Sequence, residues 1–178
     1  HDFSEAHNNL GRSLNDYGRV SNAIKSFEQA LIHNPSYANA YFNLALSLKD
    51  IGDKTGFLKN IEKTLEIRPE WGAANYHLSQ VKKYKKNDPK AAEMLSLLDR
   101  DDLDMTDRIN LNFALAKAYE DIGNHDEQFK FLEEGNHLRK KELNYSNERD
   151  IKLFSRIKEA FNPPPSNLNK KPSKLNSL

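Results

Sequence analysis

Apolar residues recur along this chain at the spacing of an amphipathic helix, and glycine or proline interrupts the pattern at intervals. Leu10 and Leu14 lie on one helical stripe, which ends at Gly18. Phe27 belongs to a second stripe, which ends at Pro35. Glycine suits a tight turn because it tolerates a positive φ, and proline cannot continue a helix. The pattern therefore predicts two short helices joined by a turn within residues 8–35.

The same pattern returns after 34 residues. The leucine of the first stripe, the turn glycine and the closing proline recur as Leu44, Gly52 and Pro69. A fixed period of this length, built on a helix–turn–helix unit, is typical of repeat architectures. We therefore expect an elongated stack of helix pairs.

The first unit resembles the tetratricopeptide repeat (TPR) family. The residues that carry the resemblance are His7, Leu10, Gly11, Leu14, Gly18, Ala23, Phe27, Ala30 and Pro35. The resemblance implies an all-α fold of the α-solenoid type, in which helix–turn–helix repeats form a right-handed superhelix. It also implies a concave groove that binds a peptide or a partner domain.

The repeat pattern predicts a single TPR array over residues 1–162. The repeats are expected at about 4–37, 38–71, 72–100 and 109–142, with a capping helix at 147–161 and a flexible tail or linker at 163–178. An acidic connector, residues 99–107, inserts three residues before the fourth repeat. Asp53, Asp88 and Asn124 each precede a predicted second helix and are expected to cap it, because their side chains accept backbone N–H groups.

A second resemblance covers about residues 4–161, and residues 113–141 carry most of it. This segment is similar to bacterial proteins in which a TPR array precedes a sulfotransferase domain, and it shares their ending of Gly135, Asn136, Leu138 and Arg139. The phosphate-cradling loop of the sulfotransferase itself is missing from the sequence. The resemblance thus implies a bacterial, sulfotransferase-associated array that carries none of the catalytic residues.

Composition narrows the function further. The chain has 27 Lys and Arg against 26 Asp and Glu, and a net charge of +1 argues against a nucleic-acid-binding protein. No apolar run approaches the roughly 18 residues of a membrane span. The absence of cysteine fits a reducing compartment, so a cytoplasmic location is predicted, although the start at His1 indicates a trimmed N-terminus.

No residue pattern indicates catalysis, a metal or a cofactor. The six histidines lack metal-ligand spacing. The acidic connector lacks the glycine and glutamate of an EF-hand loop, so a solvated acidic loop is favoured over a calcium site. The lysine cluster at 82–86 is interpreted as a solvated helix end rather than a phosphate site. We therefore expect a protein that is not an enzyme.

The candidate binding residues come from repeat positions that line the groove in TPR arrays. They are Asn8, Asn9, Arg12, Phe42, Asn43, Leu46, Tyr76, His77, Gln80, Phe113 and Lys117. Asn9 and Asn43 resemble the asparagine ladder of some TPR grooves, since an amide can both donate to and accept from a peptide backbone.

Two interpretations of the aromatic residues Phe42, Tyr76 and Phe113 stay open. They form an exposed apolar strip for a ligand, or they pack against the next repeat. The basic clamp that holds an acidic chain terminus in other TPR domains is not reproduced, because Asn8 and Ala73 stand where lysines are expected.

The sequence thus predicts a non-catalytic protein–protein interaction module that binds a peptide or partner domain in its concave groove. One alternative is the substrate-docking arm of a truncated sulfotransferase. Another is a structural oligomerisation module, and a homo-oligomer is compatible with the pattern.

Overall fold

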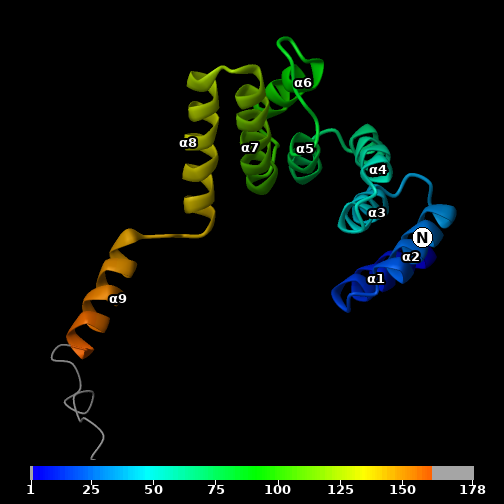
Figure 1. Ribbon diagram of the computed structural model, residues 1–178, viewed down its shortest axis with the longest axis horizontal. Helices are drawn as coiled ribbons and strands as arrows, with labels where there is room; N and C mark the ends of the chain where they lie inside the picture. Colours follow the sequence, from blue (N-terminus) through cyan, green and yellow to red (C-terminus); the bar gives the residue numbers. More distant parts are fainter. Residues whose placement is uncertain (1, 162–178) are drawn as a thin grey trace, which may run out of the picture. The chain divides into compact units, whose positions relative to one another are not determined.

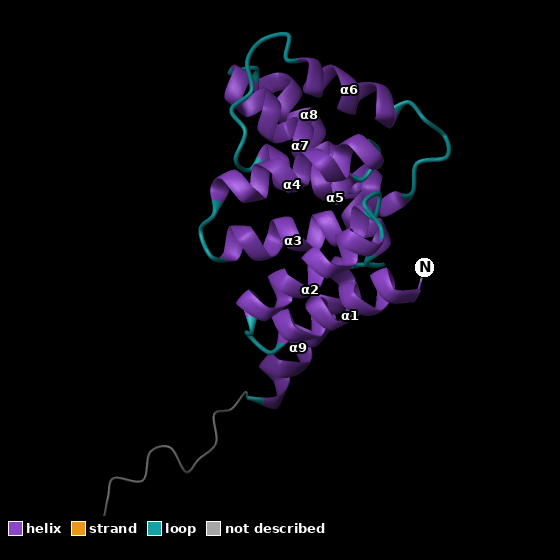
Figure 2. Cartoon of the chain, turned by 90° about the vertical axis from the view of Figure 1, so that its right-hand side faces the viewer, coloured by secondary structure: helices purple, strands orange, loops and turns teal. Residues whose placement is uncertain are grey.

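The computed structural model describes residues 2–161, which contain nine α-helices and no strand (Figures 1 and 2). The helices are α1 (Asp2–Asp16), α2 (Val20–His33), α3 (Ala38–Asp50), α4 (Lys54–Ile67), α5 (Gly72–Ser79), α6 (Pro89–Leu98), α7 (Met105–Ile122), α8 (His125–Glu142) and α9 (Asn147–Ala160). The all-α fold class predicted from the sequence is confirmed. No helix in this described part is long and apolar enough to cross a membrane.

The chain divides into two compact units, residues 1–139 and residues 140–178. In the second unit, the Ser146 hydroxyl accepts the N–H of Glu148 and caps α9, and Tyr145 donates a hydrogen bond to Asp150. No residue of α9 is buried. The helix expected at 147–161 is present, and its role as a cap stays a prediction. The tail expected at 163–178 lies outside the described residues.

The first two repeats are tightly packed helix pairs, α1 with α2 and α3 with α4. A Cβ on Gly11 would lie only 2.5 Å from the ring of Phe27, so glycine is what allows α1 and α2 to cross this closely. Phe27 is fully buried and clusters with Leu44 of α3. The turn glycines Gly18 and Gly52 have positive φ, as the sequence predicts.

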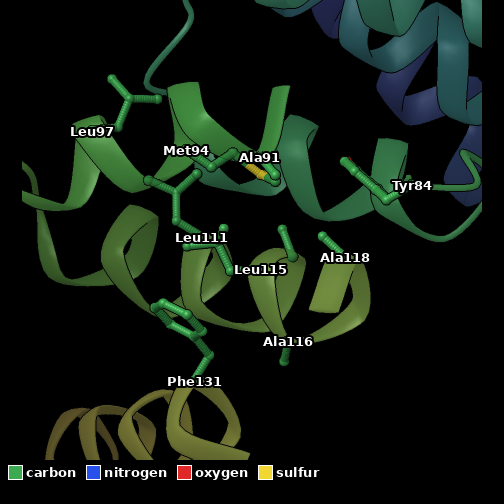
Figure 3. Packing of buried hydrophobic residues seen from close by; sticks show 10 residues of the cluster. Tyr84, Ala91, Met94, Leu97, Leu111, Leu115, Ala116, Ala118 and Phe131 are labelled. Carbon is green, nitrogen blue, oxygen red and sulfur yellow. The ribbon is translucent and has the colours of Figure 1, made fainter. Parts of the chain in front are cut away.

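The third repeat departs from the regular pattern. Its first helix, α5, has only eight residues, and the loop after it continues to Asp88, which caps α6 by accepting the N–H of Lys90 at 2.9 Å. Both α5 and α6 pack against α7. Figure 3 shows Met94 of α6 lying above Leu111 of α7, and both belong with Leu97 and Leu115 to one buried cluster.

Two side chains of the predicted acidic connector accept hydrogen bonds from backbone N–H groups at the starts of helices. Helix α7 begins within it, at Met105, because Asp104 caps the helix by accepting the N–H of Asp107 at 2.8 Å. Asp107 is itself buried and accepts the N–H of Gly72 at 2.8 Å, which closes the N-terminus of α5. Burial raises the pKa of Asp107. The expectation of a solvated acidic loop is therefore wrong for Asp107, whereas Asp104 is exposed.

Two further polar contacts hold α6 and the loop before it against α7. Arg108 donates to the carbonyl oxygens of Leu98 and Arg100 at 2.6 and 2.7 Å, so it caps the C-terminal end of α6. Asp121 lies beside the loop that contains Lys83 and Tyr84. Its carboxylate accepts hydrogen bonds from Lys83 Nζ at 2.6 Å and from the N–H of Tyr84 at 3.2 Å.

The same carboxylate also accepts from Lys117 Nζ at 2.5 Å, and its side chain is only 1% exposed. Burial alone would raise the pKa of Asp121. The hydrogen bonds from Lys117, Lys83 and the Tyr84 N–H together outweigh burial and lower the pKa to about 2. Asp121 therefore stays ionised and ties the loop to α7 at neutral pH.

Candidate interaction groove

A hollow of about 370 Å³ lies between α5, α7 and α8, and we call it the α5–α8 hollow. Its lining residues are Tyr76, Gln80, Phe113, Ala116, Lys117, Glu120, Gln128 and Leu132. Tyr76, Gln80, Phe113 and Lys117 are among the residues predicted from the sequence, and the structure brings these four together. They meet because Tyr76 and Gln80, like Phe113 and Lys117, are four residues apart, a spacing that places both members on one helix face.

The apolar lining comes from half-buried side chains on three helices. Tyr76 packs edge-on against His77, with ring centroids 5.8 Å apart. Phe113 lies between α7 and α8, and a Cβ on Gly135 would be only 3.0 Å from its ring. Glycine at position 135 thus lets α8 approach the ring. Leu132 adds an aliphatic side chain from α8.

The polar lining combines two amides with an ion pair. Gln80 is exposed, and Gln128 Oε1 lies 3.1 Å from His125 Nδ1. Lys117 Nζ lies 2.8 Å from Glu120 and also contacts Asp121, and its hydrogen bonds to Asp121 and then Glu120 raise its pKa. Because this lysine is already paired with carboxylates, it is a weak attractor for a ligand's own carboxylate.

Several of the other residues predicted from the sequence do not line the α5–α8 hollow. Phe42 packs against Trp71, with centroids 4.5 Å apart, and against His77 at 5.7 Å. Phe42 is therefore engaged at the junction of α3 and α5, which favours the packing interpretation for this ring. Burial and then the charge of Lys49 lower the pKa of His77, whose Nδ1 is buried without a hydrogen-bond partner. Leu46 is half-buried on α3.

The asparagines differ from the expected ladder. Asn8 is only 3% exposed, and its side-chain oxygen accepts a hydrogen bond from Asn43 Nδ2 at 2.9 Å. The hydrogen bond therefore joins α1 to α3 through Asn8 and not through Asn9. One amide hydrogen of Asn43 is engaged in this bond and is not available to a peptide ligand. Asn9 and Arg12 are exposed on α1.

Sequence reasoning missed the contribution of the second helices. Gln128 and Leu132 come from α8, whereas the prediction considered first helices only. Their four-residue spacing is a signal that they share a face of α8. Ala116 and Glu120 follow from the same spacing on α7.

A second hollow, of about 620 Å³, lies where the C-terminal end of α6 meets α7 and α8. Two of its polar residues, Arg108 and Asn112, already serve the fold. Arg108 caps α6, and Asn112, which is buried, donates to the carbonyl of Arg108 at 2.8 Å. Among residues 2–161, no group of three or more metal-ligating side chains could hold a metal ion. These observations favour the α5–α8 hollow as the candidate site.

Comparisons with known proteins agree with this architecture. The family model of the tetratricopeptide repeat matches residues 38–70. No functionally curated protein matches the chain. The structure is similar to a crystal structure of MamA at 19% identity and a TM-score of 0.59, covering 80% of this chain and 81% of that one.

Two further solved structures are similar. One is TTC0263, a thermophilic TPR protein of Thermus thermophilus, at 20% identity and a TM-score of 0.50, with 93% of each chain covered. The other is the TPR domain of P58(IPK), at 19% identity and a TM-score of 0.51, covering 74% of this chain and 40% of that one. The similarity to sulfotransferase-associated arrays, the bacterial origin and the cytoplasmic location stay predictions. Residues 38–70 thus match the tetratricopeptide repeat, and the chain has the fold of a TPR-type α-solenoid.

Proposed function

We propose that this chain is a non-catalytic interaction module that binds a segment of a partner protein in the α5–α8 hollow. TPR folds are typical of protein–protein interaction modules, and solenoids of this kind present extended concave surfaces to their partners. The observation that carries the proposal is the convergence of Tyr76 and Phe113, from equivalent repeat positions, in one open hollow.

The lining indicates the chemistry of the ligand. A hollow of about 370 Å³ is within the range of about 300–1,000 Å³ that is typical of ligand sites. Phe113 and Leu132 suit a large apolar side chain. Gln80 and Gln128 carry amides that can both donate to and accept from a peptide backbone. We therefore propose an extended peptide with a large apolar residue as the ligand.

A phage-displayed library of random peptides, selected against the immobilised chain, tests the proposal while the natural partner is still unidentified. Selected peptides are then measured by calorimetry against Tyr76→Ala and Gln80→Ala. Aromatic anchors at binding sites contribute about 2 kcal/mol or more, so Tyr76→Ala should weaken binding by about 30-fold. Gln80 is exposed, so its substitution should weaken binding and leave the fold intact.

Matched controls separate the site from the rest of the surface. Gln29→Ala removes an exposed glutamine from α2, and Phe129→Ala removes an exposed ring from α8 outside the hollow. Both controls should bind the selected peptides as tightly as the wild type. Peptides that bind Tyr76→Ala and Gln80→Ala with unchanged affinity would show that the α5–α8 hollow is not the site.

A further inference from the structure

Each later repeat buries the leucine at one position of its first helix, and the first repeat does not. Leu44 is 6% exposed, Leu78 is 5% exposed and Leu115 is fully buried. Leu10 occupies the same repeat position, 34 residues before Leu44, and is 51% exposed. No helix within residues 2–139 covers it.

The second helix of the preceding repeat covers the leucines of the second and third repeats. Leu44 packs with Phe27 of α2, and Leu78 packs with Ile61 of α4. The covering faces carry large apolar residues three and then four positions apart. They are Ile24, Phe27 and Leu31 on α2, and Leu58, Ile61 and Leu65 on α4. A partner for Leu10 therefore needs a helix with this same spacing.

Leu10 is part of a larger exposed stripe on α1. Phe3 is 70% exposed and Tyr17 is 84% exposed. Phe3 and Leu10 are seven residues apart, which is about two helical turns, so both lie along one side of α1. Tyr17 lies in the turn that directly follows the last residue of α1. We call these three residues the α1 face.

Helix α9 carries the spacing that such a partner needs. Phe154 and Ile157 of α9 and Phe161, the C-cap of the helix, are three and then four positions apart, and they are 68%, 45% and 65% exposed. We call them the α9 face. Because no residue of α9 is buried, the helix has no packing partner among the described residues of its own unit.

The two helices also match in length and charge. Helix α1 has 15 residues with three acidic and one basic, a net charge of −2. Helix α9 has 14 residues with four basic and three acidic, a net charge of +1. Opposite charge beside an apolar contact favours this pairing over α1 with α1 or α9 with α9.

We propose that the α9 face of one copy of this chain docks on the α1 face of a second copy, in the way that the second helix of one repeat packs on the first helix of the next. Each chain has one face of each kind, so the contact is head-to-tail and joins further copies at both ends. Only one helix per partner takes part. The area is therefore small, and we expect a dissociation constant of about 10–100 µM.

Light scattering after size-exclusion chromatography of the full chain tests the proposal. The wild-type mass should rise above the 20.5 kDa of one chain over about a hundredfold increase in concentration. Leu10→Glu removes the acceptor face and Phe154→Glu removes the donor face, so each variant alone should stay monomeric. Ser155→Glu, which adds the same charge beside the α9 face, should associate like the wild type.

The mixture of the two variants gives the sharpest result. The α9 face of Leu10→Glu remains able to dock on the α1 face of Phe154→Glu, so the mixture should form two-chain complexes and stop there. Both substituted side chains are exposed, and melting followed by circular dichroism should confirm that the variants are folded. A wild type that stays at the monomer mass throughout, or a mixture that stays monomeric, would overturn the proposal.

Discussion

The two halves of the array hold their helices together in different ways. In α1–α4, side chains that follow the 34-residue period bury the core, and the polar contacts between α1 and α3 join neighbouring first helices, as Asn15 does by donating to Ser47 at 2.8 Å. In α5–α8 the period fails, and buried carboxylates reach residues outside the repeat pattern. The Asp107 carboxylate accepts a hydrogen bond from the N–H of Gly72, and the Asp121 carboxylate accepts one from the N–H of Tyr84 in the loop after α5.

The contrast shows that helices which depart from the repeat pattern need other contacts to position them. A strict repeat positions each helix through apolar contacts that recur in every unit. Because α5 is short and a long loop follows it, some of those apolar contacts are missing in this half. Hydrogen bonds to ionised side chains replace them. The proposed binding hollow lies in this irregular half, where α5, α7 and α8 meet.

The largest effect is expected from the regular half. Phe27→Ala removes a fully buried ring from between α1, α2 and α3, and should lower the free energy of unfolding by about 3–5 kcal/mol. Urea unfolding followed by circular dichroism measures the change. Phe129→Ala, where the ring is 67% exposed, is the matched control and should change stability little. A loss below about 1 kcal/mol for Phe27→Ala would contradict apolar control of this half.

The next effect belongs to the irregular half. Asp121→Asn keeps the shape of the side chain and removes the charge that binds Lys83 and Lys117. Hydrogen bonds to charged groups contribute about 1.5–3 kcal/mol, so a loss of that size is expected in urea unfolding. Asp101→Asn, at an exposed position, is the control. Equal stability of the two variants would show that the polar contacts of α5–α8 are dispensable.

Acid provides an independent test of the same carboxylate. The pKa of Asp121 is lowered to about 2 in the folded chain, whereas an unfolded Asp titrates near about 3.9. The unfolded state thus binds the proton more readily, so this contribution is complete above about pH 4 and is lost as the pH falls toward 2. The stability difference between wild type and Asp121→Asn should shrink over this range. A difference that is independent of pH would contradict the assigned role.

The smallest effect concerns the junction of the two halves, where Phe42 of α3 meets His77 of α5. Burial and Lys49 lower the pKa of His77, so the unfolded state binds this proton more readily. Stability should therefore rise with pH up to the ordinary histidine pKa of about 6.5 and decline below it. His77→Gln should flatten that part of the profile in thermal melts. An unchanged profile would show that His77 is not a titrating contact at the junction.

The sequence predicts the regular part of the fold because its determinants are local. The period identified the turn glycines, and the caps expected from Asp53, Asp88 and Asn124 are confirmed. The contact of Asp107 with Gly72 was not predictable from spacing, because it depends on how closely α5 and α7 approach in space. The early start of α7 follows from the cap at Asp104, inside a segment that resembled a loop.

The candidate site was likewise predictable only in part. The repeat positions that line the groove in TPR arrays predicted Tyr76, Gln80, Phe113 and Lys117, and all four line the hollow. The contribution of α8 depends on the crossing of α7 and α8, which Gly135 sets by its contact with Phe113. Repeat position alone also could not distinguish Phe42, which packs against Trp71, from Tyr76, which lines the hollow.

Chemical-shift mapping of a library-selected peptide on the ¹⁵N-labelled chain tests the central claim most directly. We expect the largest amide shift changes at Tyr76, Phe113 and Gln128, which come from three separate helices and meet only in the α5–α8 hollow. Amides of α1 and α2 should change little. Shift changes that cluster instead around Glu133 and His137, in the second hollow, or along α1 would contradict the claim.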